Sequence, residues 1–103
     1  MKCLKVSQVD YELYTKIIDI DPKKPLSDYI NNCKVVGTLF LSKNCILIVD
    51  DNGLYQRHSP IFSVNGEEIA GEFLVFGGST DNGDLIPYNE QINIDITFLG
   101  LLI

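Results

Sequence analysis

Residue types on which many active sites depend are scarce in this chain. It has no tryptophan, a single histidine, His58, and three cysteines, Cys3, Cys33 and Cys45, without CxxC spacing. A metal centre built around His58 would need thiols or carboxylates at ligand spacing, and the sequence offers none. The sequence also lacks a GxSxG motif, and no pair of carboxylates stands out for general acid–base catalysis. These absences predict a protein that is not an enzyme and that holds no metal and no cofactor.

Positive charge is scarce too. Eight Lys and Arg residues stand against fourteen Asp and Glu residues, which gives a net charge of −6. Generic DNA or RNA binding requires basic side chains that displace counterions from phosphates, so direct nucleic-acid binding is not expected. Two interpretations of the excess acid remain, ordinary solubility charge and mimicry of nucleic acid. The carboxylates are scattered along the chain, which does not indicate mimicry.

Long apolar runs are also missing. None reaches the ~20 residues of a membrane span, and the negative charge opposes binding to an acidic membrane surface. Lys2 and Lys5 interrupt the start of the chain, unlike the apolar region of a signal peptide. The cysteines are odd in number, and Cys33 and Cys45 lie beside or within apolar segments. We therefore predict a cytoplasmic protein with free, mostly buried thiols.

The remaining composition is that of a folded domain. Hydrophobic residues make up 46% of the chain and charged residues 21%, which argues against disorder. A chain of 103 residues can bury a core unaided. We expect a single domain over residues 1–103.

Strand patterns dominate the chain. Asn65-Gly66 joins Ile61–Val64 to Glu67–Phe76 and is the best hairpin motif. The continuous apolar run Phe73–Phe76 predicts a strand that is covered on both faces, and Gly71 before it indicates a bulge or a close approach of a neighbouring element. Further strands are expected at Lys2–Val6, Glu12–Ile20, Lys34–Leu41 and Cys45–Val49, the last two joined by Ser42–Asn44.

Helix patterns are confined to two short segments. Pro25 suits the first turn of a helix of about two turns that ends at Asn31-Asn32. Pro87–Gln91 resembles a first helical turn, yet Ile92–Phe98 alternates as a strand does, so residues 88–99 stay open between helix and strand, with strand favoured. The expected fold class is α+β: a mostly antiparallel sheet of about five or six strands with one or two short helices.

Gly77-Gly78-Ser79-Thr80 follows a predicted strand, as a phosphate-binding loop would. A P-loop requires GxxxxGK[ST] and a dinucleotide loop requires GxGxxG before a helix, and neither pattern is present. A strand end that runs into a flexible loop is the main interpretation. The alternative is a nucleotide contact in which Gly77, Gly78, Ser79 and Thr80 supply backbone and hydroxyl donors.

The most polar loop contains Arg57, His58 and Ser59. Its main interpretation is a solvated connection, and its alternative is a ligand contact, because arginine pairs well with phosphate and carboxylate. A nucleotide pocket in so acidic a protein needs local positive charge, and Arg57 is the best single candidate. This loop and Gly77–Thr80 would then have to meet in space, within one chain or across a dimer.

Two acidic turns, Asp50–Gly53 and Asp81–Asp84, resemble calcium loops. Neither fits the EF-hand spacing or has the glutamate that should follow, and turn chemistry explains both. A basic protein target is a separate possibility for these turns. In that case the contact residues would be Asp50, Asp51, Asp81 and Asp84.

The C-terminal segment Leu99–Ile103 is apolar to its last residue. Such a tail should dock on its own core or on a second subunit. We expect Ile92–Ile103 to be buried partly through self-association, with a homodimer as the favoured oligomer. The expected interface residues are Phe98, Leu101 and Ile103.

Three stretches carry a family resemblance: Cys45–Leu54, Asn65–Phe76 and Asp84–Gln91. They combine an apolar strand ending in an acidic Asn-Gly turn, a strand with spaced Gly, Ile and Phe, and a segment ending in Glu-Gln. This pattern resembles a family of small domains of unknown function carried by phages, plasmids and conjugative elements of Gram-positive bacteria. The resemblance implies a mobile-element accessory protein that counters host defence, and it transfers no catalytic residues.

Three functions are compatible with these features. The first is a non-enzymatic mobile-element protein that binds a host target, either by sequestering a nucleotide immune signal or by occluding a defence protein. The second is a structural or assembly module that forms oligomers through its apolar tail. The third is a small enzyme with an unrecognised site. The scarcity of catalytic residue types favours the first.

Overall fold

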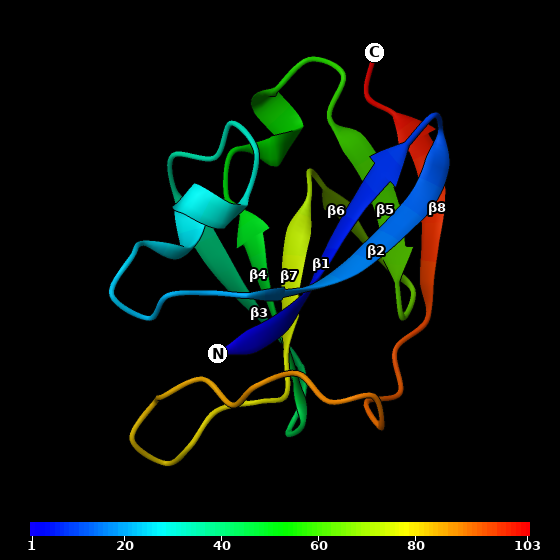
Figure 1. Ribbon diagram of the computed structural model, residues 1–103. Helices are drawn as coiled ribbons and strands as arrows, with labels where there is room; N and C mark the ends of the chain where they lie inside the picture. Colours follow the sequence, from blue (N-terminus) through cyan, green and yellow to red (C-terminus); the bar gives the residue numbers. More distant parts are fainter.

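The computed structural model describes the backbone of residues 1–103 and every side chain except that of Tyr55. Eight strands form two antiparallel sheets, and two short 3-10 helices, η1 (Leu26–Tyr29) and η2 (Gly53–Tyr55), lie between strands (Figure 1). The described backbone contains no α-helix. The fold is therefore all-β, and the expected α+β class is wrong.

The larger sheet has the strand order β2–β1–β7–β4–β3, with antiparallel neighbours throughout. β1 and β2 are joined at Asp10-Tyr11, whose φ angles of 53° and 65° are positive, as a type I′ turn requires. β3 and β4 are joined at Lys43-Asn44, one residue fewer than the predicted connection. The strands are β1 (Lys2–Val9), β2 (Glu12–Asp19), β3 (Val36–Ser42), β4 (Cys45–Asp50) and β7 (Phe73–Phe76).

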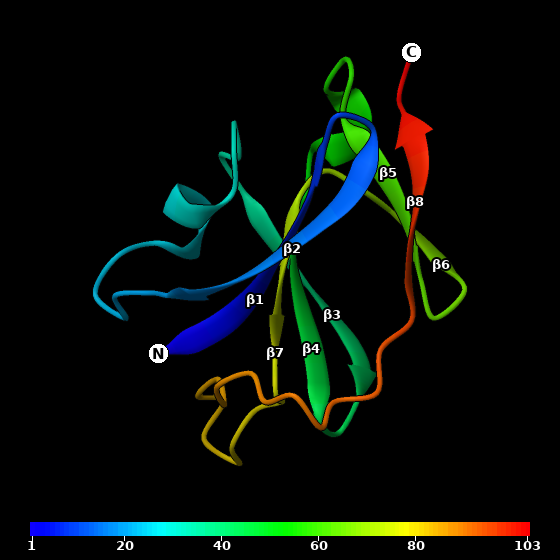
Figure 2. The ribbon, with the colours of Figure 1, turned by 45° about the vertical axis from the view of Figure 1, so that its right-hand side comes forward.

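The smaller sheet has the strand order β6–β5–β8, and Figure 2 shows β8 alongside β5. Its strands are β5 (Pro60–Val64), β6 (Glu67–Ala70) and β8 (Ile96–Leu101). β5 and β6 form the hairpin predicted at Asn65-Gly66, where both φ angles are positive, 49° and 87°. This prediction is confirmed, because two successive positive φ angles are what an Asn-Gly pair adopts readily.

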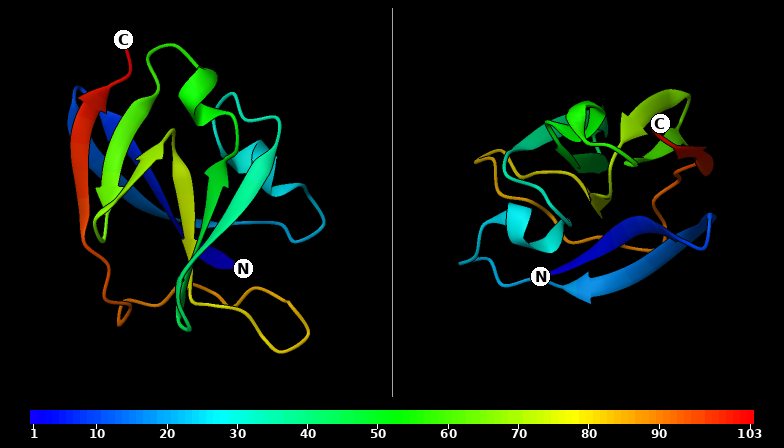
Figure 3. Two further views of the ribbon diagram at one scale, coloured as in Figure 1. Left: turned by 180° about the vertical axis from the view of Figure 1, so that it is seen from behind. Right: turned by 90° about the horizontal axis from the view of Figure 1, so that it is seen from above.

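The segment Glu67–Phe76, predicted as one strand, is divided between the two sheets. Gly71 has a φ of +94°, a backbone conformation that other residues rarely adopt, and the chain bends there. The first part continues as β6 in the smaller sheet, and the second part enters the larger sheet as β7 (Figure 3, left). Gly71 therefore marks a change of sheet, which joins the two layers covalently.

Two apolar clusters cover the two faces of β7. The first lies between the sheets and contains Phe62 and Phe73, whose rings meet edge to face with centroids 5.4 Å apart. The second lies on the outer face of the larger sheet and contains Leu74 and Phe76. All four residues of β7 are buried, so the prediction that both faces of Phe73–Phe76 are covered is confirmed.

The second cluster is covered by irregular chain rather than by a helix. The expected two-turn helix after Pro25 is reduced to the four residues of η1. A helix of this length gains few hydrogen bonds for the residues it orders, so packing decides the conformation. Buried Ile30 fixes the segment on the cluster, and Asn32 ends it with a φ of 58°.

Residues 88–99 contain no helix. The helical turn suggested for Pro87–Gln91 is irregular backbone, and the strand predicted at Ile92–Phe98 is paired only from Ile96 onward. Ile92 and Ile94 still pack against the first cluster. The alternating apolar residues of this segment are therefore partly buried on one side, but only its C-terminal part is paired in a sheet.

Candidate functional site

A large hollow lies on the outer face of β1 and β2, opposite the η1 segment. It is a cleft of ≈ 710 Å³. Its floor includes Lys5 and Ser7 from β1 and Tyr14 and Lys16 from β2. The η1 segment forms one wall, and Figure 1 shows this segment beside the β1–β2 hairpin. Wall residues include Ser27, Asp28, Tyr29, Asn31, Asn32, Cys33 and Glu72.

Strand register gathers the floor residues. Lys5 is paired with Lys16, and Ser7 is paired with Tyr14. Side chains of directly paired residues lie on the same face of a sheet. The hairpin thus places two cations, one hydroxyl and one phenol side by side, although the two residues of each pair belong to different strands.

The two lysines differ in their partners. Lys5 Nζ lies 3.5 Å from Glu72 Oε1, which also accepts a hydrogen bond of 3.0 Å from the Asn31 backbone N–H. Both charged side chains of that ion pair are largely buried, with exposures of 29% and 20%. Lys16 is exposed and takes part in neither of the two ion pairs found among the described residues. Of the two lysines that line the cleft, Lys16 is the one without an ion-pair partner among the described residues.

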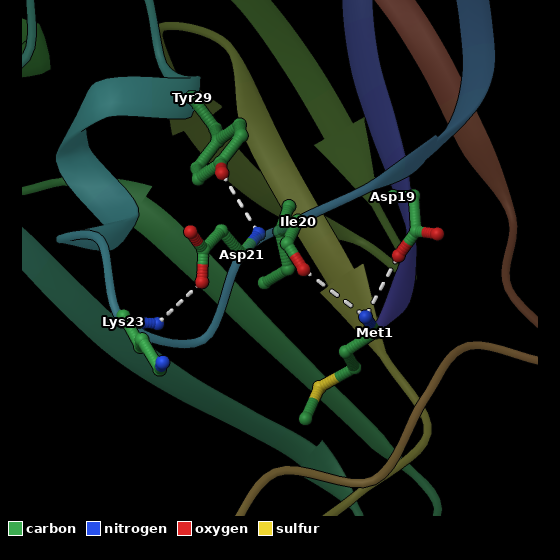
Figure 4. A network of polar contacts seen from close by, with 6 residues as sticks. All are labelled: Met1, Asp19, Ile20, Asp21, Lys23 and Tyr29. Carbon is green, nitrogen blue, oxygen red and sulfur yellow. Dashed lines mark hydrogen bonds and ion pairs between the residues drawn. The ribbon is translucent and has the colours of Figure 1, made fainter.

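Polar contacts hold the cleft wall against the sheet (Figure 4). The Met1 amino group donates to Asp19 Oδ1 at 2.7 Å and to the Ile20 carbonyl oxygen at 3.0 Å. The backbone N–H of Asp21 donates to the Tyr29 hydroxyl at 2.8 Å. The hydrogen bond from the amino group lowers the pKa of Asp19. Tyr29 is thereby positioned at the edge of the cleft by the chain that leaves β2.

A smaller hollow of ≈ 190 Å³ adjoins the cleft and contains the predicted loop residues Arg57, His58 and Ser59. Arg57 and His58 are exposed, whereas Ser59 is buried. The two hollows are neighbours, because three residues line both of them: Asn31, Asn32 and Glu72. The Arg57–Ser59 part of the site predicted from the sequence therefore lines a hollow next to the cleft.

The carboxylate of Asp50 anchors this loop instead of facing a partner. Asp50 is only 7% exposed. Its Oδ2 accepts a hydrogen bond of 2.6 Å from Gln56 Nε2, and its Oδ1 accepts one of 2.9 Å from the Asn52 backbone N–H. Gln56 Nε2 also lies 3.1 Å from the Asn32 carbonyl oxygen. The assignment of Asp50 to an exposed protein-binding face is thus not supported by its position.

The Gly77–Thr80 loop lies far from the Arg57 loop. The loop that follows β7 and the η2 loop occupy opposite ends of the molecule (Figures 1 and 3). The N–H of Gly77 donates to the Ile86 carbonyl oxygen at 2.8 Å, and the N–H of Thr80 donates to the Asp84 carbonyl oxygen at 2.8 Å. Two amides of the predicted phosphate cradle are thus used within the loop. Within one chain the two predicted halves of the pocket do not meet.

Close packing explains the two glycines of this loop. A Cβ at Gly77 would lie 2.5 Å from the Pro87 carbonyl oxygen, and one at Gly78 would collide with the Lys43 carbonyl oxygen. Both glycines are buried. Ser79 and Thr80 are exposed, and Thr80 Oγ1 accepts a hydrogen bond of 3.1 Å from the Asp84 backbone N–H. The main interpretation, a strand end that leads into a loop, agrees with these contacts.

The other predicted interface residues fall into two groups. Asp51, Asp81 and Asp84 are exposed. Phe98 and Leu101 are half-buried on their own chain, and the ring of Phe98 lies 5.6 Å from that of Phe62. Ile103 is fully exposed. The tail therefore packs mainly on its own sheet, and the expected dimer stays a prediction.

The three thiols are free, and their surroundings favour the protonated form. Burial raises the pKa of Cys3 to about 11, and it also raises the pKa values of Cys33 and Cys45. Cys33 lines the cleft, and its thiol donates to the Val35 carbonyl oxygen at 3.4 Å. Among the described residues, no group of three or more His, Cys, Asp and Glu side chains is arranged to hold a metal ion.

Sequence reasoning missed the cleft residues Lys5, Tyr14, Lys16 and Glu72. Each belongs to an ordinary strand pattern or to a bend, and no local motif distinguishes it. The one usable indication was the β1–β2 hairpin itself, because its register brings Lys5 and Lys16 together. Glu72 joins them only through the packing of β7 beside β1.

Comparisons with known proteins leave the family open. No protein-family model matches the sequence, and no curated protein and no solved structure gives a significant match. Among the described residues, no helix is long and apolar enough to span a membrane. The mobile-element resemblance of the sequence remains a prediction.

Proposed function

We propose that this protein is a non-enzymatic binding protein of a phage or other mobile element, and that its cleft takes a nucleotide. The observation that carries the proposal is the exposed Lys16 on the cleft floor beside Tyr14. An unpaired ammonium group attracts a phosphate, and an aromatic side chain offers a face on which a base stacks. The mobile-element context comes from the sequence resemblance alone.

Charge distribution supports an anionic ligand at this place. The cleft and the adjoining hollow contain three of the eight basic residues, Lys5, Lys16 and Arg57. They also contain three of the fourteen acidic residues, Asp28, Asp50 and Glu72. The lining is therefore neutral, while the rest of the chain carries the whole net charge of −6. A phosphate meets less repulsion here than elsewhere on the surface.

The biological consequence of the proposal is sequestration of a nucleotide immune signal. A cleft of ≈ 710 Å³ has the size range of ligand pockets. Binding without turnover would lower the free concentration of the signal. The alternative mode, occlusion of a defence protein, uses exposed surface and does not require the cleft. Direct measurement of nucleotide binding separates the two modes.

Nucleotide binding is tested by isothermal titration calorimetry against a panel of mononucleotides and cyclic dinucleotides. We expect Lys16→Ala and Tyr14→Ala each to raise the Kd of the bound nucleotide about tenfold or more. A hydrogen bond from a charged group is worth about 1.5–3 kcal/mol, and stacking of a base on an aromatic side chain is worth about 1–3 kcal/mol. Lys43→Ala is the matched control, since Lys43 is exposed in the β3–β4 turn and does not line the cleft. It should change the Kd less than twofold.

Two results would contradict the proposal. One is an absence of saturable binding by any nucleotide of the panel. The other is an equal loss of affinity in Lys43→Ala and Lys16→Ala, which would show that the loss comes from the change in net charge and not from a contact in the cleft. Thr80→Ala serves as a second control, because the Gly77–Thr80 loop lies at the other end of the molecule. A loss of affinity in Thr80→Ala would move the site away from the cleft.

A further inference from the structure

The two sheets leave an open side between β3 and β6. β3 is an outer strand of the larger sheet, and β6 is an outer strand of the smaller one. A groove of ≈ 330 Å³ lies between β3–β4 and β6. Figure 3 (left) views the molecule from this side, with β3 and β6 toward the reader. Of the residues that line the groove, none lines the ≈ 710 Å³ cleft, and only Asp50 also lines the ≈ 190 Å³ hollow. The residues that would bind a nucleotide, Lys16 and Tyr14, are not part of the groove, so its binding role can be tested separately.

The floor of the groove is apolar. Leu39 and Val49 from the larger sheet and Ile69 from β6 line it, and all three belong to the first core cluster or pack against it. Leu54, from η2, also lines the groove and is 70% exposed. An apolar side chain placed here would extend the core and cover Leu54. The groove therefore suits a partner that brings apolar side chains.

The rim of the groove is acidic. Asp51, Glu67 and Glu68 line it and are exposed. No lysine or arginine is found among the described residues that line it. A basic partner is attracted by this rim, whereas a second copy of the chain, with its own acidic rim and net charge of −6, is repelled. Charge thus selects a basic occupant over self-association at this groove.

The strand edges supply the third element of recognition. An outer strand presents unpaired N–H and C=O groups along its free edge, and an extended peptide can pair with them. β3 has seven residues and β6 has four, so β3 offers the longer edge. Side chains of an added strand alternate between two faces. Side chains on one face of the added peptide would contact the apolar floor of the groove, and side chains on its other face would lie near the acidic rim.

We propose that the β3–β6 groove binds an extended basic peptide segment of a protein partner, one that alternates Lys or Arg with apolar residues. The segment adds to the edge of β3, its apolar side chains contact Leu39 and Leu54, and its cations contact Glu67 and Glu68. This surface gives the protein a second binding activity, independent of the cleft.

The probe for this groove is a nine-residue peptide that alternates Lys and Val, added to the ¹⁵N-labelled protein. We expect saturable shifts of backbone amide resonances in Val36–Phe40 and Glu67–Ala70. The double variant Glu67→Lys/Glu68→Lys should weaken binding at least tenfold. Asp81→Lys/Asp84→Lys is the matched control, because it changes net charge equally at exposed positions outside the groove, and it should weaken binding less than threefold.

A second pair of measurements tests the apolar floor. A peptide that alternates Lys and Ser should bind at least tenfold more weakly than the Lys–Val peptide. Leu54→Ser, at a side chain exposed enough to leave folding intact, should weaken binding of the Lys–Val peptide severalfold. Equal weakening by the two charge-reversed variants, shifts centred on β2 or β8, or no saturable binding would each overturn the proposal.

Discussion

Gly77 and Gly78 show how two small residues fix a loop. Their backbones approach the carbonyl oxygens of Pro87 and Lys43 so closely that a side chain at either position would displace its neighbour. Gly78 also has a φ of +116°. The glycine pair that suggested a phosphate loop in the sequence is therefore explained by packing between the end of β7, the β3–β4 turn and the segment after Ile86.

Gly78→Ala is expected to destabilise the protein more than Gly83→Ala. Both glycines have positive φ and lie in the same loop, but a Cβ at Gly83 meets nothing within 4 Å. The positive φ alone costs roughly 1–2 kcal/mol in the variant. Collision with the Lys43 backbone adds roughly 1–3 kcal/mol at Gly78. Urea unfolding measures both values, and equal losses would show that the close approach to Lys43 is not a constraint.

The strand β7 organises both apolar clusters. Phe73 and Val75 belong to the first cluster, and Leu74 and Phe76 belong to the second. It pairs with β1 on one side and with β4 on the other. A continuous apolar run is therefore required here, because every one of its side chains faces protein.

Three Phe→Ala variants test this double burial with one kind of change. Phe73 and Phe76 are fully buried in different clusters, whereas Phe40 on β3 is 68% exposed. We expect Phe73→Ala and Phe76→Ala each to lower the free energy of unfolding by about 3–5 kcal/mol. Phe40→Ala should change it by about 0.5 kcal/mol or less. A small effect at Phe76 alone would mean that the outer cluster does not contribute.

At the scale of the whole molecule, the C-terminal tail ties the smaller sheet to the η2 loop. The His58 N–H donates to the Leu102 carbonyl oxygen at 2.9 Å, and the Leu102 N–H donates to the Ser59 carbonyl oxygen at 2.8 Å. His58 itself has a positive φ of 65°. Leu102 thus holds the loop that lines the hollow next to the cleft.

Truncation after Leu101 is expected to loosen this loop. It removes both hydrogen bonds to Leu102, so the free energy of unfolding should fall by about 1–3 kcal/mol, and the His58 amide should exchange its hydrogen faster. Truncation after Leu102 is the control, because it removes only the fully exposed Ile103. Hydrogen exchange followed by NMR distinguishes the two. Unchanged exchange at His58 in the shorter chain would contradict this role of the tail.

Much of the local structure could be predicted from the sequence. The Asn65-Gly66 hairpin, the strands on either side of it and the double burial of Phe73–Phe76 result from turn chemistry and from the pattern of apolar residues. The helices were predicted wrongly because their segments are short, so their conformation depends on packing. The contact of Ile30 with the outer cluster is not encoded in any local pattern.

The candidate site, too, could be predicted from the sequence only in part. The sequence by itself determined the single histidine, the small number of basic residues and the polarity of the Arg57–Ser59 loop. Only the tertiary structure decided that this loop lines a hollow next to the cleft, that Asp50 is buried and that Gly77–Thr80 lies at the other end of the molecule. A local pattern fixes backbone conformation within a few residues. Distances between remote loops depend on which strands pair, and here the bend at Gly71 places β6 and β7 in different sheets.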